Sequence, residues 1–378
     1  MSLNILIVPD KFKGTLTARQ AAEAIAEGWS RSRPQDKLEL LPMSDGGDGF
    51  GEVMSLLLQG KVKSTATVDA AHRPRKAKWW WVARTKTAII ESAEVIGLAL
   101  LPTGKYHPFQ LDTCGLGAAF QAAARMGAVH CLAGIGGSAT NDGGFGLARS
   151  LGWEFFDRKG RTITDWGNLV NLSDIRAPKR RTFFEDLVVA SDVRNPLLGP
   201  TGATKVYGPQ KGMKPTDYAT AEAALRRLAT VAKKELLPDC AKQPGAGAAG
   251  GLGFGLRCFL DARLEPGFEL FADHANLSHR LRSVDLVITA EGAIDKSSLM
   301  GKGVGQIAEL CRSMGIPCIG LAGVIKNPIL ARGHFTRVES IAPNLTSEVE
   351  AKRKPIYWLA KLAAEIGSAL PSDSESRP

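Results

Sequence analysis

Strand-like and helix-like patterns alternate at both ends of the chain, and this alternation restricts the fold more than any other feature. Near the N-terminus, hydrophobic periodicity predicts strands at 3–8 and 37–42 and helices at 16–29 and 50–58. Towards the C-terminus, it predicts strands at 284–289, 316–323 and 338–343 and helices at 304–314 and 349–370. Such alternation is typical of an α/β domain built on a parallel sheet, to which both ends of the chain contribute.

The first of these helices carries its own start signal. Thr17 and Gln20 have the spacing of a capping box, in which each side chain bonds to the backbone N–H of the other residue. Ala22, Ile25 and Trp29 then fall on one helical face. We therefore expect an amphipathic helix here, which makes residues 9–14 a strand-to-helix loop.

The middle of the chain has a different character. It contains a hairpin-like pair of segments at 61–68 and 76–92, followed by glycine-rich turns. Helical periodicity appears at 116–126, 216–236 and 268–281. This order of elements indicates an α+β unit.

We interpret the chain as two domains, one inserted into the other. Residues 1–60 and 284–370 form the parallel-sheet domain, and residues 61–283 form the inserted α+β domain. The cleft between two such domains is the expected site. The tail at 371–378 is too polar to pack and is expected to be disordered.

Composition indicates a soluble, cytoplasmic protein. Apolar residues make up 44% and charged residues 23%, and no run of about 18 apolar residues offers a membrane span. The opening MSLNILIVPD lacks the basic segment and cleavage site of a signal peptide. The six cysteines show no C-x-x-C spacing, so we expect neither disulfides nor zinc.

The net charge of +10 raises the question of a nucleic-acid partner. The basic residues are dispersed, with short clusters only at 72–78 and 176–181, and no nucleic-acid-binding motif accompanies them. Clusters of this length are more typical of solvated loops. We therefore expect no nucleic-acid partner, and an acidic small substrate explains the sign of the charge equally well.

Three strand-to-helix loops of the first domain hold unusual charge: 9–14, 43–49 and 290–298. In an open parallel sheet, such loops share the carboxyl edge, where ligands bind at the switch in strand order. The first loop contributes Lys11 and Lys13, and lysine suits phosphate oxygens. Together, the loops suggest phosphoryl chemistry.

Two of these loops carry paired acids. Asp45 and Asp48 are three residues apart, and Glu291 and Asp295 are four residues apart. Either spacing allows two carboxylates to share a magnesium ion directly or through water. The alternative is that these acids only form turns or face solvent, which is the more frequent role of any single such pair.

The inserted domain adds a glycine-rich strand-to-helix loop, GIGGSATNDGGFG, at 134–146. Ser138, Asn141 and the backbone N–H groups near the following helix can hold an anion, whereas Asp142 would repel one unless it binds a hydroxyl or a metal. Asp192 follows the strand-like EDLVVA and could accept a hydroxyl proton, or could simply cap a turn.

The familiar nucleotide and hydrolase signatures do not apply. PGAGAAGGLGFGL, at 244–256, contains G-x-G-x-x-G, but a helix and a loop precede it where the dinucleotide fingerprint requires a strand. A helix packed tightly through its glycines, or a loop along a nucleotide, fits better. The P-loop, the protein-kinase elements, H-E-x-x-H and the G-x-S-x-G elbow are absent from the sequence.

Taken in order, the motifs of this chain closely resemble those of the bacterial type I glycerate kinases. The matching blocks are PDKFKGTLTARQAAEAI, LPMSDGGDG, GIGGSATNDGG, SDVRNPLLGPTGA, YGPQKG, PGAGAAGGLG and ITAEGAIDKSSLMGK, within residues 3–370. The resemblance implies a flavodoxin-like domain with a second domain inserted. It also implies transfer of the γ-phosphoryl group of ATP, with Mg²⁺, to a hydroxyl of glycerate, usually giving 2-phosphoglycerate.

The resemblance also implies roles for particular residues. Asp192 is the first choice for general base, with Asp142 as the alternative, and Lys13 and Lys211 would contact phosphate or carboxylate. Substrate binding falls to Ser138, Asn141, Asp142, Arg194 and Asn195. Nucleotide binding falls to Asp10, Lys11, Gly46, Gly47, Gln210, Lys211 and Gly292, and magnesium binding to Asp45, Asp48, Glu291 and Asp295.

The chain departs from the usual family pattern at five positions, the first of which is Ala290 in place of a glycine. Ala293 stands where arginine is usual and Ser297 where glutamine is usual; Lys11 replaces a serine, and Arg194 a threonine. Lysine's point charge does not reproduce arginine's bidentate fork. Two alternatives follow: a kinase for another small hydroxy acid, or a catalytically silent binding or regulatory protein on the same fold. A homodimer is left open.

Overall fold

The computed structural model describes residues 2–235, 240–299 and 303–370 and divides the chain into two compact units. Unit 1 comprises Met1–Asp45 and Phe268–Pro378, and unit 2 comprises Gly46–Gly267. The sequence interpretation instead placed the boundaries at 60/61 and 283/284. Helix α2 (Phe50–Leu58) belongs to unit 2 because it packs on strands β4 and β5 of that unit. The predicted disordered tail, 371–378, lies outside the described residues.

Unit 1 is built on a five-stranded parallel sheet in the order β13-β12-β11-β1-β2. The strands are β1 (Asn4–Pro9), β2 (Lys37–Leu40), β11 (Leu286–Ile294), β12 (Cys318–Ile325) and β13 (Arg337–Ala342). Read from β2, this is the flavodoxin-like order 2-1-3-4-5, whose switch point lies between the first and third strands. Here these strands are β1 and β11, so the carboxyl ends of the two mark the expected ligand position.

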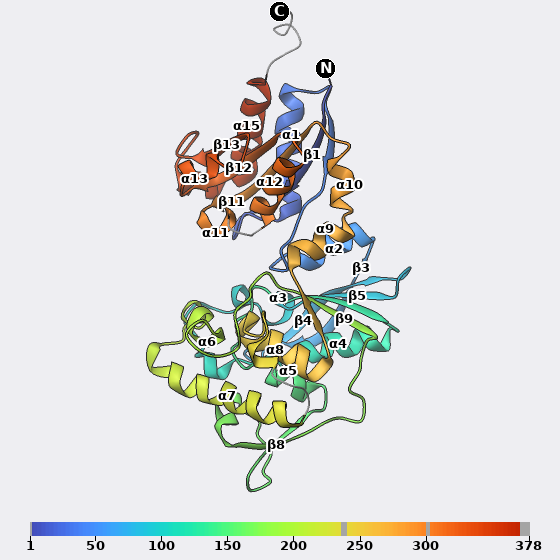
Figure 1. Ribbon diagram of the computed structural model, residues 1–378, viewed down its shortest axis with the longest axis vertical. Helices are drawn as coiled ribbons and strands as arrows, with labels where there is room; N and C mark the ends of the chain where they lie inside the picture. Colours follow the sequence, from blue (N-terminus) through green and yellow to red (C-terminus); the bar gives the residue numbers. More distant parts are fainter. Residues whose placement is uncertain (1, 236–239, 300–302, 371–378) are drawn as a thin grey trace, which may run out of the picture. The chain divides into compact units, whose positions relative to one another are not determined.

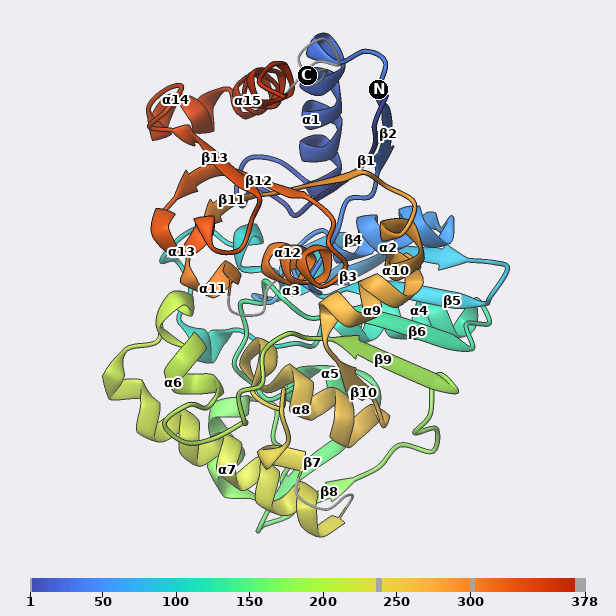
Figure 2. The ribbon, with the colours of Figure 1, turned by 45° about the horizontal axis from the view of Figure 1, so that its top comes forward.

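Helices flank this sheet, and α1 (Ala18–Ser32) packs against α15 (Pro355–Ser368) (Figures 1 and 2). The predicted capping box is confirmed: Thr17 Oγ1 accepts the Gln20 N–H, and the Gln20 side chain accepts the Thr17 N–H. Trp29 is fully buried. The other helices are α9 (Gly267–His274), α10 (Leu277–Leu281), α11 (Lys296–Leu299), α12 (Gly303–Ser313), α13 (Pro328–Arg332) and α14 (Glu348–Arg353).

Two helices predicted as continuous are each broken in the structure. The predicted helix at 268–281 is α9 and α10, separated where Asn276 adopts the left-handed conformation with φ of 52°. The predicted helix at 349–370 is α14 and α15, separated at Lys354. Pro355 explains the second break, because proline lacks an N–H and disfavours helical geometry in the residue before it.

Unit 2 contains a six-stranded mixed sheet in the order β10-β9-β6-β5-β4-β3. The strands are β3 (Lys61–Val68), β4 (Pro74–Val82), β5 (Thr87–Glu91), β6 (His130–Gly134), β9 (Asp186–Ala190) and β10 (Arg263–Glu265). β3 and β4 form the predicted antiparallel hairpin, and the segment predicted at 76–92 divides into β4 and β5, which also pair antiparallel. β5, β6, β9 and β10 run parallel (Figure 2). The register aligns Glu91, Gly134, Ala190 and Glu265 in one row at the carboxyl edge.

Helices and a small hairpin complete unit 2. The hairpin is β7 (Glu154–Asp157) with β8 (Leu172–Arg176). The further helices are α3 (Ala93–Ile96), α4 (Leu116–Arg125), α5 (Phe145–Ser150), α6 (Ala203–Tyr207), α7 (Tyr218–Glu235) and α8 (Ala248–Leu260). Among the helices of residues 2–235, 240–299 and 303–370, none combines the length and apolar character of a membrane span.

Candidate active site

The carboxyl edge of the unit 1 sheet gathers the charged residues that follow its strands. Asp10 directly follows β1, and its backbone N–H donates to the Ala290 carbonyl of β11. Asp10 is largely buried, whereas Lys13 is exposed. Lys11 Nζ lies 3.9 Å from Asp45 Oδ1. Thus the structure brings Asp10, Lys11 and Asp45 to the switch-point side of this edge.

The segment predicted as the loop 290–298 is partly strand. β11 continues to Ile294 because Glu291, Ala293 and Ile294 pair with β12. Gly292 lies close to the first loop: a Cβ added there would sit 3.2 Å from Phe12 Cα. The sequence pattern missed the extension because Ala-Glu-Gly reads as a turn when the neighbouring strand is unknown.

Ser298 connects the two acids at the end of this segment. Its hydroxyl donates to Glu291 Oε1, and its backbone N–H donates to Asp295 Oδ1 at 3.2 Å. The predicted pair Glu291 and Asp295 is therefore brought together. The members of the other predicted pair, Asp45 and Asp48, belong to different units. Within the described part of the chain, no three His, Cys, Asp or Glu side chains form a ready-made metal cluster.

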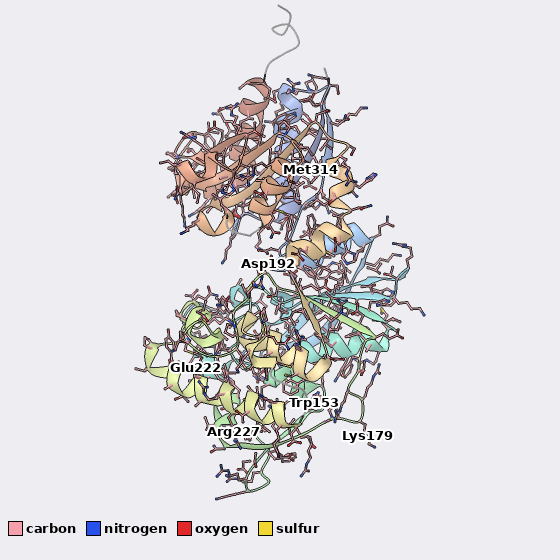
Figure 3. All side chains as sticks on the ribbon, viewed as in Figure 1. Trp153, Lys179, Asp192, Glu222, Arg227 and Met314 are labelled. Atoms are coloured by element: carbon pink, nitrogen blue, oxygen red, sulfur yellow. The ribbon has the colours of Figure 1, made fainter. Side chains whose placement is uncertain are left out.

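The carboxyl edge of the unit 2 sheet carries the second group of predicted residues. Asp192 lies two residues beyond β9 (Figure 3). Its Oδ1 accepts the N–H of Gly267 at 2.7 Å, just beyond β10. Because β9 and β10 are parallel neighbours, this bond fixes the carboxylate at the sheet edge. The loop after β6, which contains Ser138, begins at the same edge.

Glycines let the loops at this edge approach through their backbones. Gly136 N donates to the Gly46 carbonyl at 3.1 Å, and a Cβ on Gly136 would lie 2.5 Å from Gly47 Cα. A Cβ on Gly137 would lie 1.8 Å from Asp48 Oδ1. The 46–49 loop is thus in direct contact with the glycine-rich loop at 136–142. Because the resemblance implies that this second loop binds the substrate, we call it the acceptor loop.

Glu91 lies at the carboxyl edge of the unit 2 sheet and was not among the residues predicted from the sequence. It ends β5, is 5% exposed, and its two carboxylate oxygens accept the N–H groups of Gly49 and Gly51 at 2.8 and 2.9 Å. Burial raises the pKa of Glu91 to about 7; the two amides oppose the shift, and the charges of Glu94 and Asp48 reinforce it. The sequence feature that could have identified Glu91 is an acidic residue at the end of a strand, which is the feature that pointed to Asp192.

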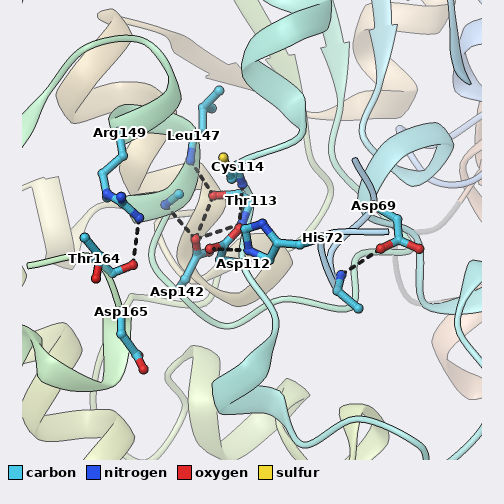
Figure 4. A network of polar contacts seen from close by, with 12 residues as sticks. Asp69, His72, Asp112, Thr113, Cys114, Asp142, Leu147, Arg149, Thr164 and Asp165 are labelled. Carbon is cyan, nitrogen blue, oxygen red and sulfur yellow. Dashed lines mark hydrogen bonds and ion pairs between the residues drawn. The ribbon is translucent and has the colours of Figure 1, made fainter. Parts of the chain in front are cut away.

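Asp142 lies at the centre of a buried polar network (Figure 4). Its Oδ2 accepts the Thr113 N–H, the Thr113 hydroxyl and the Gly146 N–H at 2.9, 2.7 and 2.9 Å, and its Oδ1 accepts the Gly144 N–H at 3.3 Å. The side chain is 0% exposed. Burial raises the pKa of Asp142 to about 6, and the nearby charge of Asp112 adds to the shift.

This geometry favours a role for Asp142 that differs from the predicted one, which stays a prediction. The sequence analysis placed it on a substrate hydroxyl, or as the alternative base, but its oxygens already hold the first turn of α5 and the Thr113 backbone. Its carboxylate lies at the N-terminus of α5, where backbone N–H groups need an acceptor. We propose this reassignment: Asp142, at the end of the acceptor loop, holds the loop in place by accepting the N–H groups of Thr113 and Gly146.

Lys211 extends the same support. Its ammonium is buried and donates to Ser138 Oγ at 3.1 Å and to the Thr140 carbonyl at 2.6 Å. Burial lowers the pKa of Lys211 to about 7, and the charge of Asp142 opposes the shift. Lys211 thus ties the acceptor loop to the 3₁₀ turn Pro209–Lys211. Two of its three donors are engaged by this loop.

The lowered pKa of Lys211 leads us to expect that the stability of the protein depends on pH. Because its pKa falls from 10.5 to about 7 on folding, the folded state binds fewer protons than the unfolded state between these values. Wild-type stability should therefore rise, relative to Lys211→Met, as pH increases from 7 to 10.5, by up to about 4 kcal/mol. Urea unfolding of both proteins across this pH range tests the prediction. If the unfolding free energies of the two proteins change in parallel with pH, Lys211 binds its proton equally in the folded and unfolded states, and the prediction is wrong.

The remaining predicted residues of unit 2 differ in accessibility. Asn195 is engaged within its own loop, since Nδ2 donates to the Thr201 carbonyl and Oδ1 accepts the Tyr207 hydroxyl. Asn141 is fully buried and donates to Thr204 Oγ1 at 3.1 Å. Arg194 and Gln210 are exposed. Arg194 is therefore accessible to a ligand, whereas both asparagines have partners within unit 2; the predicted substrate contacts of all three residues stay predictions.

The segment 244–256 packs through its glycines, one of the two alternatives that the sequence left open. Ala249, Gly250 and Gly251 form a left-handed turn within α8. A Cβ on Gly250 would lie 2.0 Å from the Thr140 carbonyl oxygen, and one on Gly255 would lie 2.7 Å from Gly144 Cα. α8 therefore lies against the acceptor loop with no room for side chains.

Known proteins are similar to this chain over most of its length. The sequence pattern of the glycerate kinase family matches residues 5–371. Glycerate kinase of Halalkalibacterium halodurans is 39% identical over 96% of this chain and 97% of its own, and glycerate 2-kinase of Escherichia coli K12 is 37% identical over 86% and 87%. A crystal structure from Salmonella typhimurium LT2, described as glycerate kinase 2, has a TM-score of 0.82 and 31% identity over 97% of this chain and 98% of that one. The flavodoxin-like unit with its inserted α+β unit, the ordered motifs and these relatives agree: the chain is an enzyme of the glycerate kinase family.

Proposed function

We propose that this enzyme transfers the γ-phosphoryl group of ATP, with Mg²⁺, to a hydroxyl of glycerate and gives 2-phosphoglycerate. The observation that carries the acceptor half of this proposal is the position of Asp192. Its carboxylate is fixed at the carboxyl edge of the unit 2 sheet by the N–H of Gly267, next to the strand whose loop holds Ser138. A fixed carboxylate beside hydroxyl-binding groups is what a general base for an alcohol requires.

In the proposed reaction, the glycerate hydroxyl oxygen forms a bond to the γ-phosphorus while the bond from that phosphorus to the β,γ-bridging oxygen breaks. The hydroxyl proton passes to Asp192, and ADP leaves with the bridging oxygen. Little covalent work remains for the protein, so positioning and charge dominate. Ser138 offers a hydroxyl to the acceptor, and exposed Arg194 offers a charge to its carboxylate.

We assign the nucleotide to the carboxyl edge of the unit 1 sheet. Lys13 is exposed there and Lys11 lies near Asp45, so both can contact phosphate oxygens. Glu291 and Asp295, held together through Ser298, are the oxygen donors that fit Mg²⁺. Sites that use one or two carboxylates together with substrate phosphates are typical of this ion. When bound, Mg²⁺ neutralises charge on the transferring phosphoryl group.

Lys211 has a different proposed role from the one implied by the resemblance. Its ammonium is buried against Ser138 and Thr140, so it acts on the acceptor through the loop. Burial lowers the pKa of Lys211 to about 7, so an anionic acceptor bound at this loop would favour its protonated form, whose charge counters that of the ligand.

The function is tested by measuring ADP release from ATP with D-glycerate and Mg²⁺, and by identifying the product with ³¹P NMR. We expect turnover that EDTA abolishes and a phosphate ester at the 2-hydroxyl. A panel of other small hydroxy acids in the same assay addresses Ala293 and Lys11, which depart from the usual family pattern. Faster turnover of another acid would replace glycerate as the acceptor, and failure of every acid would favour a binding or regulatory protein.

A further inference from the structure

The 46–49 loop is held at two places. At its start, the Gly46 carbonyl accepts the Gly136 N–H, and a Cβ on Gly46 would lie 2.8 Å from the Ala190 carbonyl oxygen at the end of β9. At its end, Glu91 accepts the N–H groups of Gly49 and Gly51. The contacts therefore join this loop to the carboxyl ends of β5, β6 and β9.

The contact made by Glu91 is specific in its geometry. Gly49 is the N-cap of α2 and Gly51 lies in its first turn, so the two N–H groups belong to the end of a helix where no helical carbonyl is available. A carboxylate satisfies both at once, one with each oxygen, and its charge is favourable at the positive end of the helix. Glu91 thus ties the start of α2 to the end of β5.

Asp48 lies between these two anchors. Its carboxylate is in contact with Gly137, since a Cβ there would lie 1.8 Å from Asp48 Oδ1, and Ser138 follows directly. Any change in the path of the 46–49 loop must therefore move Asp48 relative to the acceptor loop. Gly136 and Gly47 are in close backbone contact, so the acceptor loop cannot move closer to compensate for a shift of the 46–49 loop.

We propose that Glu91 is a positioning residue for phosphoryl transfer, which sets the place of Asp48 beside Ser138 through the 46–49 loop; this rests on the proposed function of unit 2. Glu91 does not itself contact the acceptor, because its side chain is 5% exposed and both oxygens bind the start of α2. It acts by holding the loop in one register. Misplacement of reacting groups by about 1 Å can cost about 100-fold in rate.

The test compares Glu91→Gln, Glu91→Ala and a matched control, Glu94→Gln. Glu94 is three residues further on, in α3, and its charge is paired with Arg75. The control removes the same charge close by but leaves the 46–49 loop bonds in place. In Glu91→Gln, one oxygen still accepts an N–H, while the new amide donor faces the other N–H.

We expect kcat/KM for glycerate to fall about 100-fold in Glu91→Ala, about tenfold in Glu91→Gln and less than threefold in Glu94→Gln. The KM for ATP should stay within about twofold, because the nucleotide is assigned to the unit 1 edge. Hydrogen exchange of a peptide covering residues 46–54 should accelerate in both Glu91 variants and not in the control.

Two results of this experiment would contradict the proposed positioning role of Glu91. Unchanged exchange in the Glu91 variants would show that the loop does not depend on Glu91. Faster exchange with kcat/KM equal to that of the control would reduce Glu91 to a purely structural residue. Both results overturn the proposal. If the wild type phosphorylates no hydroxy acid while exchange still accelerates, the proposed function fails but the anchoring of the loop stands. If Glu91→Ala does not fold, Glu91→Gln carries the comparison.

Discussion

Asp192→Asn should lower kcat by about 1,000-fold while leaving the fold intact. The amide retains Oδ1 as acceptor for the Gly267 N–H, so the side chain keeps its place at the sheet edge. It cannot take a proton from the acceptor hydroxyl, and loss of a general base typically costs 100- to 10,000-fold, roughly. Steady-state ADP release at saturating ATP and glycerate measures the change.

Asp186→Asn is the matched control for this prediction. Asp186 begins β9 and therefore lies at the end of this strand opposite to Asp192. It forms an ion pair with Arg263, the first residue of β10. The same chemical change there should leave kcat within about twofold, because surface ion pairs contribute little. A loss of less than about tenfold in Asp192→Asn would remove Asp192 as the base and leave transfer dependent on positioning alone.

Asp142→Ala should destabilise unit 2 by about 4 kcal/mol. The substitution leaves the buried N–H groups of Thr113, Gly144 and Gly146 without their acceptor, and buried unsatisfied donors cost about 1–3 kcal/mol each before relaxation. In a unit of this size, such a loss lowers Tm by roughly 10 °C. Differential scanning calorimetry or thermal unfolding followed by circular dichroism measures it.

Asp165→Ala provides the comparison for Asp142. Asp165 also caps a helical turn, accepting the Gly167 N–H at 2.8 Å, but it is exposed, so water can replace it. Its Tm shift should be much smaller. If instead Asp142→Ala keeps the wild-type Tm and raises only the KM for glycerate, Asp142 binds the acceptor hydroxyl and our reassignment is wrong.

The sequence was sufficient for features that local periodicity determines. The capping box at Thr17 and Gln20, the hairpin from Lys61 to Val82 and the discontinuous parallel sheet all follow from patterns within a few turns or strands. Pro355 also carries a local signal for a break that the helical prediction at 349–370 ignored.

The sequence was insufficient where distant segments supply the hydrogen-bond partners. Asp142 binds Thr113, 29 residues earlier, and Lys211 binds Thr140 at a separation of 71 residues. A glycine-rich loop with an acid predicts ligand binding when these partners are unknown. The burial of both groups is the basis for the supporting roles that we propose for them. Glu91 was missed for the same reason, because its partners begin a helix 40 residues earlier.

The close approach of α8 to the acceptor loop has an evolutionary consequence. Gly250 and Gly255 meet Thr140, Gly143 and Gly144 through main-chain atoms, so the path of the loop is fixed at positions where even a methyl group does not fit. If this loop binds the acceptor as we propose, changes in acceptor preference come from positions that carry side chains, such as Ser138 and Arg194, while the loop keeps its shape. Relatives that use different acceptors could therefore have the same backbone conformation in this loop. A new substrate preference could then evolve by side-chain substitutions without a change in that conformation.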